Sequence, residues 1–582
     1  MTPLASNVPI SEALLKGFPR LSQRYFHTVH KAIPKLISQL PLKGIYWQII
    51  DSLAYFIMEG SSVNTSDSIS PSTIETPQPP KVDSIHFGTD GWRAIIGEDF
   101  NSRSVARLAA ATALAYKQRL VDNPQLAANG ILIGYDCRQD AGRYAALVAT
   151  VIADYGFDVQ ISDRYCPTPA LCYTIAHDTT LVGGVMLTSS HNPAEYLGIK
   201  LRMEDGGASP QPFTDIVEAA LIDELPACYA QATANFAAAQ NGTPDQPAAP
   251  LPAAPQLQFT NIMGAYLEAL QSFVDEPLIR NANLKVVLDP LYGAGRGYLA
   301  NILRSLGVEV AEVNGTNDPT FAGLHPEPIM PWVKTGADKV VSLGFDACFV
   351  TDGDADRIGA IDDKGTYVTT HRLLALLIGH LVEDRGLDGR VVRNLAGSNL
   401  LLRQCQRLGL SLTTCPVGFK WIYGEMLKGN VLIGGEESGG MGIPSHVRER
   451  DGLLMALLLT ELMAQKGKKL SELVDELLAE LGTLEYSRRD LRLTPQQKEA
   501  FLATHVQGSS VSFDDYLKLF EPLGETLTEI DRVDGLKFLL ASDAWLLIRP
   551  SGTEPLVRVY AEAVDDAQVQ ALLDCGCTLA QG

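Results

Sequence analysis

The sequence predicts a multidomain α/β protein, with three related α/β domains that have mixed, largely parallel sheets and a smaller α+β domain at the C-terminus. The first observation is length, because 582 residues are too many for a single hydrophobic core. The second is a strand–helix–strand pattern that recurs three times. The third is a change of pattern from Leu491 onward, where strand-like runs flank a polar loop.

The recurring pattern covers Ile131–Ser162, Leu284–Gly315 and Gly389–Gly418. Each segment has a short apolar run, a polar loop containing glycine, a helical stretch, a glycine and a second apolar run. The glycines that follow the helical stretches are Gly156, Gly307 and Gly409. We expect them to end the helices in the left-handed conformation. Such units favour parallel strands, with their strand-to-helix loops at the sheet edge where ligands bind.

Composition divides the chain further. Ser61–Pro80 is rich in serine, threonine and proline, and Ala227–Gln256 is rich in alanine and proline, so both are typical of linkers. In the tail, "WLLIRPSGTEPLVRVYAEA" predicts two strands around a loop, and a helix is expected over Asp566–Leu573. The predicted segments are an extension and linker (1–80), a first domain (81–226), a linker or insertion (227–257), and domains at 258–367, 368–488 and 489–582.

Charge and cysteine content exclude some classes of protein. The formal net charge of −21 argues against a general nucleic-acid binder, although a few arginines in one cleft can still attract an anionic small molecule. Nine cysteines without a CxxC pair indicate reduced thiols. The most apolar early stretch, Gly44–Met58, is interrupted by Asp51 and is too short to span a membrane. We therefore expect a cytoplasmic protein without a signal peptide.

Two features stay open at this stage. Glu12–Leu42 is mildly basic with helix-like spacing, which fits either a helix that docks on a membrane surface or partner, or a dispensable extension. The oligomeric state is open between monomer and dimer.

An aspartate-rich loop carries the strongest chemical signal. In "FVTDGDADRIGAID", Asp352, Asp354 and Asp356 alternate after an apolar strand. Three carboxylates so close together repel one another unless a cation lies between them, and oxygen ligands suit Mg²⁺. Arg357 follows directly and is placed to contact a phosphate oxygen. An acidic turn is the alternative.

A glycine-rich loop follows a later strand. In "LIGGEESGGMGIPSHVRERDG", Glu436 and Ser438 offer acceptors for sugar hydroxyls. Taken alone, this segment fits a simple turn equally well.

A polar loop in the tail predicts a phosphate site. "IRPSGTEPLVRVY" places Arg549, Ser551, Gly552 and Thr553 within five residues, which supplies a guanidinium, two hydroxyls and backbone N–H groups. The alternative is a polar hairpin loop.

A pair of serines stands at the end of an apolar run. In "GGVMLTSSHNPAEYLGIKLR", Ser189 and Ser190 follow the strand-like Val182–Leu187, and Lys200 lies on the next strand. No GxSxG elbow is present, so a hydrolase triad is not indicated, and the segment by itself favours a turn. A separate stretch near the start of the body, "HFGTDGWRAIIGEDF", carries Arg93 after a glycine-rich turn.

Taken together, these loops resemble those of the α-D-phosphohexomutase family, the phosphoglucomutase and phosphomannomutase enzymes. "TSSHNP" matches the family's phosphoserine loop, "DGDADR" its magnesium loop, "GEESGG" its sugar-binding loop and "RPSGTEP" its phosphate-binding loop. The motifs occur in the family's order, one per domain, and the resemblance runs from about Ile85 to the C-terminus. It implies a four-domain fold around a deep central cleft.

The resemblance also implies a mechanism. Ser190 would carry a phosphoryl group that passes to one end of a sugar phosphate, and the other phosphate of the resulting bisphosphate would return to Ser190. One Mg²⁺ would bridge Ser190 to the three aspartates, with glucose 1,6-bisphosphate as activator and intermediate. Arg93, Lys200 and Arg357 would supply positive charge to the transferred group.

Substrate contacts follow from the same resemblance. Glu436 and Ser438 would bind the sugar, and the non-reacting phosphate would be held by Arg549, Ser551, Gly552 and Thr553. The stretch "PVGFKWI" matches the loop that distinguishes the two orientations of the sugar, which assigns Gly418, Phe419 and Lys420 to the site.

One departure affects the chemistry. Many phosphomannomutase and phosphoglucosamine mutase relatives have histidine where this chain has Gly440, so the general acid/base is open, with Lys200 or another group to be considered. The loops incline the prediction toward interconversion of glucose 1-phosphate and glucose 6-phosphate. The alternatives are a phosphomannomutase, a phosphoglucosamine mutase, a phosphatase and a non-catalytic regulatory protein that binds sugar phosphates.

Overall fold

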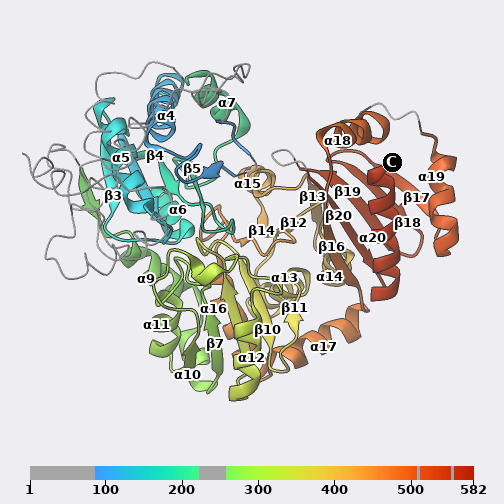
Figure 1. Cartoon of the computed structure of the whole chain (residues 1–582). Helices are drawn as coiled ribbons and strands as arrows, with labels where there is room; N and C mark the ends of the chain where they lie inside the picture. Colours follow the sequence, from blue (N-terminus) through green and yellow to red (C-terminus); the bar gives the residue numbers. More distant parts are fainter. Residues whose placement is uncertain (1–84, 89, 127, 222–256, 508–510, 552–555) are drawn as a thin grey trace, which may run out of the picture. The chain divides into compact units, whose positions relative to one another are not determined.

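The computed structural model describes residues 85–88, 90–126, 128–221, 257–507, 511–551 and 556–582. These residues belong to one compact unit that runs from Pro79 to the C-terminus (Figure 1). The extension predicted for 1–80 and the linker at 227–256 lie outside the described residues.

The first sheet has the strand order β1-β5-β4-β2-β3-β6. Its strands are β1 (Trp92–Ile95), β2 (Gly130–Tyr135), β3 (Asp158–Ser162), β4 (Leu181–Leu187), β5 (Tyr196–Met203) and β6 (Gln258–Thr260). Strands β4, β2, β3 and β6 run parallel, whereas β5 is antiparallel to both β4 and β1. All residues of β2 are buried, as expected for a central strand covered on both faces.

Helices cover the two faces of this sheet. They are α4 (Ser102–Asp122), α5 (Ala141–Asp154), α6 (Thr168–His177) and α7 (Gln211–Ala219). Leu132 of β2 shares a hydrophobic core with residues of α6. Its neighbours Ile131 and Ile133 share another core with residues of α4 and α5, because successive side chains of a strand point to opposite faces.

The second sheet has the order β11-β10-β9-β7-β8. Its strands are β7 (Lys285–Asp289), β8 (Glu309–Glu312), β9 (Ala347–Thr351), β10 (Ile358–Asp362) and β11 (Tyr367–Val368), and its helices are α9 (Met263–Phe273), α10 (Glu276–Asn281), α11 (Tyr298–Ser305) and α12 (Lys334–Leu343). Strands β8, β7 and β9 are parallel, and β10 turns back antiparallel to β9.

The third sheet has the order β13-β12-β14-β15. Its strands are β12 (Arg390–Asn394), β13 (Leu412–Cys415), β14 (Val431–Gly435) and β15 (Met441–Gly442), and the helices around it are α13 (Thr370–Gly379), α14 (Asn399–Leu408), α15 (Phe419–Leu427), α16 (Gly452–Lys466) and α17 (Leu470–Leu481). Strands β13, β12 and β14 are parallel and β15 is antiparallel. Helix α16 is buried along Gly452–Met463 and packs against α9 and α10, so the largest core continues from the second sheet into the third.

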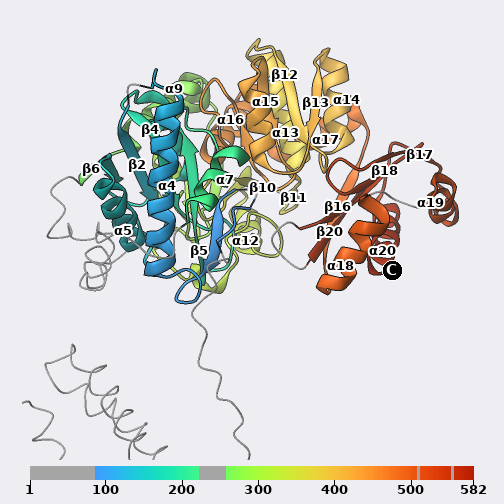
Figure 2. The same cartoon turned by 90° about the horizontal axis from the view of Figure 1, so that it is seen from above.

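The fourth sheet is antiparallel throughout, with the order β16-β20-β19-β18-β17. Its strands are β16 (Glu485–Arg492), β17 (Leu527–Asp531), β18 (Leu536–Leu540), β19 (Trp545–Pro550) and β20 (Leu556–Ala563), and its helices are α18 (Pro495–Phe501), α19 (Phe513–Phe520) and α20 (Asp566–Gln581). Helix α20 runs past the predicted end at Leu573 and packs against α18, β16 and β20 (Figure 2). Short 3₁₀ or π-helical segments cover Phe321–Gly323, His380–Asp384, Leu502–Val506 and Glu521–Leu523.

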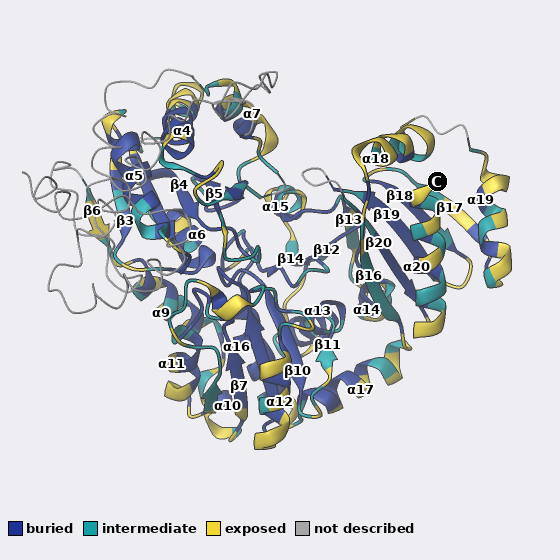
Figure 3. Ribbon diagram, in the orientation of Figure 1, coloured by how far each residue is buried: buried dark blue, intermediate teal, exposed yellow. Residues whose placement is uncertain are grey.

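Each predicted site loop occupies the same kind of position in its sheet. The serine loop joins β4 to β5, and the aspartate loop joins β9 to β10. The glycine-rich loop that carries Glu436, called the sugar loop after its predicted role, joins β14 to β15, and the polar loop of the tail joins β19 to β20. In all four cases the two strands are antiparallel neighbours. Strands β4, β9 and β10 are buried along their whole length, which gives the first two loops rigid ends (Figure 3).

The predicted fold class is confirmed: within this body, a first, second and third α/β unit, each built around the sheet of the same number, precede a smaller C-terminal fourth unit around the fourth sheet. The helix-ending glycines of the repeat are left-handed, with φ of 87° at Gly156, 82° at Gly307 and 70° at Gly409. One boundary differs from the prediction. We expected residue 258 to begin the second domain, but β6 pairs with β3 in the first sheet, because an exposed edge strand remained available there.

Candidate active site

Ser190 lies at the end of β4 in a buried, tightly held turn. Its residue is 1 % exposed, and its backbone has a φ of 51°, which is uncommon for a residue with a side chain. The Ser190 N–H donates to Thr188 Oγ1 at 2.9 Å, and the Thr188 hydroxyl donates to Asp136 Oδ2 at 2.6 Å. These bonds hold a conformation that a simple exposed turn would not need.

Arg138 holds the serine loop through its backbone carbonyls. Its guanidinium donates to the backbone carbonyls of Ser190 at 2.6 Å and Asn192 at 2.7 Å, and it is paired with Asp136 at 3.2 Å. Arg138 is 1 % exposed. Arg138 belongs to no motif of its own in the sequence, although "DCR" directly after the first strand of the repeat places an acid and a base at the functional edge of the sheet.

The aspartate loop lies directly against the serine loop. The Ser190 hydroxyl donates to Asp352 Oδ2 at 2.8 Å. A Cβ at Gly353 would lie 2.3 Å from the Ser190 carbonyl oxygen, so this approach requires glycine. The two loops, 162 residues apart in sequence, therefore form one centre.

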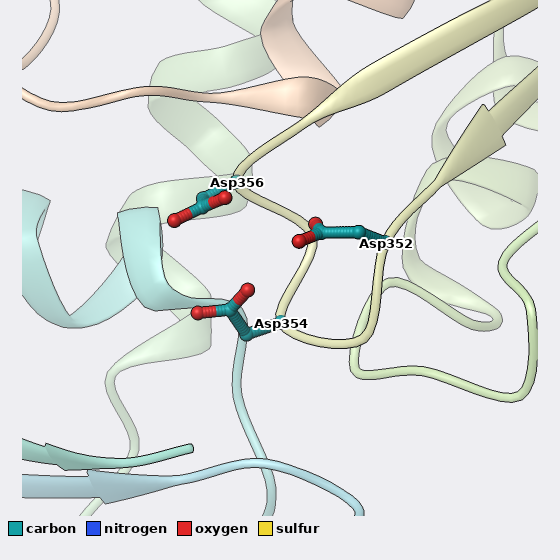
Figure 4. A group of neighbouring side chains, drawn as sticks. All are labelled: Asp352, Asp354 and Asp356. Carbon is teal, nitrogen blue, oxygen red and sulfur yellow. The ribbon is translucent and has the colours of Figure 1, made fainter. Parts of the chain in front are cut away.

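The three aspartates gather at the tip of their loop (Figure 4). Each is completely buried, and one oxygen of each lies within 4.8 Å of the others. The Oδ1 atoms of Asp354 and Asp356 have no hydrogen-bond partner among the described residues. Buried carboxylate oxygens without a donor fit a hard divalent cation, and the donor set contains only oxygen. Burial, followed by the charges of Asp356 and Asp354, raises the pKa of Asp352 well above its ordinary value.

Lys200 of β5 balances part of this charge. Its Nζ lies 2.8 Å from Asp354 Oδ2 and 2.9 Å from Asp356 Oδ2, and it also pairs with Asp90 at 2.9 Å. Burial opposes the charged form, but the three carboxylates outweigh it and raise the pKa of Lys200 above its ordinary value. Lys200 is therefore a positively charged group at neutral pH rather than a free base.

Further cations surround the serine loop. Arg93 on β1 donates to Asn192 Oδ1 at 2.6 Å, and Arg357 is 8 % exposed with Nε 3.9 Å from Asp356 Oδ1. Burial and the charges of Arg357 and Arg93 hold the pKa of His191 well below its ordinary value, so its imidazole is neutral. Positively charged side chains on β1, on β5 and directly before β10 thus lie near the serine loop.

The sugar loop is attached to the aspartate loop through the backbone. The N–H of Ile358 donates to the carbonyl of Gly439 at 3.0 Å, and Arg357 forms an isolated β-bridge with Gly440. Glu436 is 6 % exposed, and burial raises its pKa to about 7 although Arg450 opposes the shift. Ser438 lies half-buried on the same loop.

Arg450 occupies the space beside Gly440. A Cβ at Gly440 would lie 2.3 Å from Arg450 Cδ, so the absence of a side chain there makes room for this guanidinium. Arg450 Nη2 lies 2.7 Å from Asp356 Oδ2 and Nη1 lies 3.4 Å from Glu436 Oε2. Arg450 therefore links the aspartate loop to the sugar loop. The sequence alone does not single out Arg450, because nothing in "RERDG" shows which charged side chain points inward.

The loop "PVGFKWI" and the fourth unit are joined by Asp534. Its Oδ2 accepts from the Val417 N–H and from Arg549 Nε, each at 2.8 Å. Gly418 has a φ of 126°, and the buried Phe419 ring lies 5.3 Å from the Arg450 guanidinium.

The remaining predicted residues differ in how far the structure places them. Lys420 Nζ donates to Gln211 Oε1 at 3.1 Å, which connects α15 to α7. Ser551 is 4 % exposed at the end of β19. Gly552 and Thr553 lie outside the described residues.

Direct contacts thus bring together Ser190, Lys200 and the three aspartates, and Arg450 extends the cluster to Glu436. Arg549 is connected to the Gly418 loop rather than to Ser190. None of the helices in the described residues has both the length and the apolar composition that crossing a membrane requires.

Family models match the chain in four consecutive parts. They are described as phosphoglucomutase/phosphomannomutase alpha/beta/alpha domain I over residues 84–225, domain II over 264–365, domain III over 369–481, and the C-terminal domain over 512–574. Each contains one of the four site loops or the strands that carry it.

Similar proteins cover most of the chain. A "Phosphoglucomutase/phosphomannomutase" of Thermococcus kodakarensis is 30 % identical over 85 % of this chain and 98 % of its own length. A "Phosphoglucomutase" of Komagataeibacter xylinus is 27 % identical over 83 % and 88 %. The solved structure of a Thermus thermophilus protein, assigned as a phosphomannomutase, matches with a TM-score of 0.70 and 32 % identity over 86 % and 99 %. The chain therefore belongs to the phosphoglucomutase/phosphomannomutase family, the α-D-phosphohexomutases.

Proposed function

We propose that the protein interconverts glucose 1-phosphate and glucose 6-phosphate through a phosphoserine at Ser190 and glucose 1,6-bisphosphate. The observation that carries the proposal is the position of the Ser190 hydroxyl, buried and 2.8 Å from Asp352 Oδ2 at the tip of the aspartate loop. Phosphoryl transfer needs positioned charges more than covalent chemistry from the protein. This centre supplies such charges through Lys200 and the three aspartates.

The phosphoryl group is transferred between Ser190 and the sugar in two steps. In the first, the P–O bond at phosphorylated Ser190 breaks as the 6-hydroxyl oxygen of glucose 1-phosphate bonds to the phosphorus. That hydroxyl loses its proton and Ser190 Oγ takes one up, which leaves the bisphosphate and free Ser190. In the second, the bond between O1 and its phosphorus breaks as this phosphoryl group bonds to Ser190 Oγ. The serine hydroxyl loses its proton, O1 takes one up, and glucose 6-phosphate leaves. Lys200, Arg93 and Arg357 stabilise the charge on the transferred group. Asp352, Asp354 and Asp356 would hold a Mg²⁺, which neutralises charge on the phosphoryl oxygens when bound.

The substrate is held from two sides in this proposal. Glu436 and Ser438 bind sugar hydroxyls. The loop of Gly418, Phe419 and Lys420 distinguishes the two orientations of the sugar. The non-reacting phosphate is held by Arg549, Ser551, Gly552 and Thr553. The support is the Asp534 bridge, which couples the Gly418 loop to Arg549.

The domain roles follow from the loops. Residues 81–226 form the phosphoserine domain, 258–367 the metal-loop domain, 368–488 the sugar-binding domain and 489–582 the phosphate-binding domain. The enzyme acts in the cytoplasm in this proposal.

Three measurements test the function. The first compares initial rates with glucose 1-phosphate, mannose 1-phosphate and glucosamine 1-phosphate, each with Mg²⁺ and the matching bisphosphate. We expect the highest kcat/KM for glucose 1-phosphate, and if it is the poorest of the three substrates the proposed sugar is wrong.

The second measurement is mass spectrometry of the intact protein and its peptides. We expect a labile phosphate on Ser190 that glucose 1-phosphate removes. A regulatory protein would carry none, and a phosphatase would release inorganic phosphate without any requirement for bisphosphate. Treatment with a chelator should abolish the mutase activity, and added Mg²⁺ should restore it.

A further inference from the structure

Asp90 stands just before β1, in the turn that leads into the first sheet. Gly91 has a φ of 95°, and a Cβ there would lie 2.5 Å from the Ile199 carbonyl oxygen and 3.2 Å from Lys200 Cα. This close approach is possible only for glycine, and it lays the turn over β5. The register of β1 on β5, with Trp92 opposite Ile199, continues the same contact. Asp90 is thereby placed beside Lys200.

The Asp90 carboxylate contacts three cations. Its Oδ2 lies 2.9 Å from Lys200 Nζ and 2.5 Å from Arg450 Nη2, and its Oδ1 lies 3.1 Å from Arg202 Nη1. The side chain is 10 % exposed. Burial opposes its ionisation, but Lys200, Arg202 and Arg450 outweigh burial and hold the pKa of Asp90 well below its ordinary value. Asp90 is therefore a charged group inside the cluster.

Lys200 is shared between two sets of acceptors. An ammonium group has three N–H donors, and Lys200 Nζ has three carboxylate neighbours: Asp354 at 2.8 Å, Asp356 at 2.9 Å and Asp90 at 2.9 Å. Two of these belong to the aspartate triad, whereas Asp90 does not. The Lys200 ammonium group and a divalent cation in the triad would both contact Asp354 and Asp356. Because both are positively charged, the ammonium group and the cation repel each other.

We infer that Asp90 is a positioning residue: by holding Lys200 from outside the triad, it keeps the ammonium close enough to act on the phosphoryl group without displacing the divalent cation. The inference rests on the proposed function in taking the triad as the metal site. Loss of the Asp90 charge leaves Asp354 and Asp356 as the only two of these three groups that still neutralise Lys200. The affinity of the triad for the cation then falls.

The test measures metal binding without any sugar. Mn²⁺ is titrated into the full chain by isothermal calorimetry, and Mg²⁺ is titrated in competition. We expect Asp90→Asn to weaken Mn²⁺ binding by roughly tenfold, the lower end of the range for residues that orient metal ligands. Asp90→Glu keeps the charge, and we expect its affinity for Mn²⁺ to stay within about threefold of that of the parent protein.

Asp205 offers a matched control. It also links the end of β5 in the first unit to the third unit, because Tyr423 OH donates to its Oδ1 at 2.9 Å and Arg448 Nη1 lies 3.0 Å from its Oδ2. These partners are not the cations that contact the triad. Asp205→Asn should therefore leave Mn²⁺ binding unchanged, and an equal loss in both variants would show a general effect of the interface and overturn the inference.

A double-mutant cycle separates positioning from simple charge loss. If Asp90 acts through Lys200, Asp90→Asn should have little effect on Mn²⁺ affinity in a Lys200→Met background. Equal effects in both backgrounds would mean that Asp90 acts on the metal by its charge alone, and the inference would be wrong. Should Lys200→Met not fold, the same cycle is run with Lys200→Gln, which removes the charge but keeps a polar side chain.

The possible failures are distinguishable. If the parent protein binds no Mn²⁺, the metal role in the proposed function fails. If the parent binds Mn²⁺ and Asp90→Asn binds it equally well, only the role of Asp90 fails.

Discussion

The serine–aspartate centre and the region around Arg549 in the fourth unit, for which we propose phosphate binding, are built differently. In the first, Ser190 donates to Asp352, and Lys200 pairs with Asp354 and Asp356, so that groups from two sheets touch and are fully buried. In the second, Arg549 lies on an antiparallel sheet and reaches the third unit through Asp534, which is 24 % exposed.

The difference separates two demands on a phosphohexomutase. Groups that act on a transferred phosphoryl must be fixed relative to one another, because a small displacement removes the alignment of attacking and leaving oxygens. Groups that hold the non-reacting phosphate must accept the substrate in two orientations. Dense buried contacts suit the first demand, and a single bridging carboxylate that connects Arg549 to the Gly418 loop suits the second.

The largest expected effect is at the nucleophile. Ser190→Ala should lower kcat by on the order of 10⁴-fold or more, because the acceptor of the phosphoryl group is lost. Ser189→Ala is the matched control, since Ser189 is equally buried but its hydroxyl has no hydrogen-bond partner among the described residues. Initial rates and phosphopeptide mass spectrometry measure both variants. An active Ser190→Ala enzyme would move the nucleophile elsewhere.

The close approach of the two loops gives the next effect. Gly353→Ala places a Cβ 2.3 Å from the Ser190 carbonyl oxygen and must push the loops apart, so kcat should fall roughly 100-fold. Gly424→Ala on α15 meets no described atom within 4 Å and serves as control. Thermal unfolding of both variants should accompany the kinetics. If Gly353→Ala retains full kcat, the fixed contact between the loops is not needed for transfer.

A smaller and different effect is expected in the fourth unit. If Arg549 holds the non-reacting phosphate as proposed, Arg549→Ala removes a charged hydrogen bond worth about 1.5–3 kcal/mol, so kcat/KM should fall by roughly 10- to 150-fold, mainly through KM. Arg489→Ala is the control, because the Arg489 side chain donates to Gln570 of α20 instead. A loss confined to kcat would place Arg549 with the serine centre and remove the contrast between the two regions.

The smallest effect on activity, but a clear one on stability, is expected for Lys537. It is 5 % exposed, donates to the Leu395 carbonyl at 2.6 Å and lies 4.1 Å from the centre of the Trp545 ring. Burial, with the charge of Arg393, lowers its pKa from 10.5 to about 7. Its folded pKa is therefore below its unfolded one, so the stability that it contributes is complete above pH 10.5 and is lost as the pH falls toward 7.

The Lys537 prediction is tested by the melting temperature at several pH values. Between about pH 7 and 10, the melting temperature of the parent protein relative to Lys537→Met should rise with pH, and below about pH 7 the difference should be constant. Lys518→Met on the exposed side of α19 should show no such trend. A flat difference for Lys537→Met across this range would mean that the lysine stays protonated in the folded protein.

Much of the fold was predictable because the signals were local. The strand–helix–strand repeat needs only apolar runs and glycines at fixed places, and Gly156 and Gly307 adopt the expected left-handed conformation. The edge strand β6 was not predictable in this way. Its three residues carry no pattern of their own, and they pair with β3 because an open edge was available after a long connection.

The candidate site shows the same division. The chemical character of the site was determined by the sequence alone. The serine pair, the three alternating aspartates, the glycine-rich acidic loop and the polar loop with Arg549 are each recognisable within a few residues. The tertiary structure alone decided which charges meet. Asp90, Arg138 and Arg450 look ordinary in the sequence, yet each contacts the serine loop, the aspartate loop or the lysine between them. The physical reason is that a buried charge must find an opposite charge or a hydrogen-bond partner, and the fold supplies that partner from strands far away in the chain.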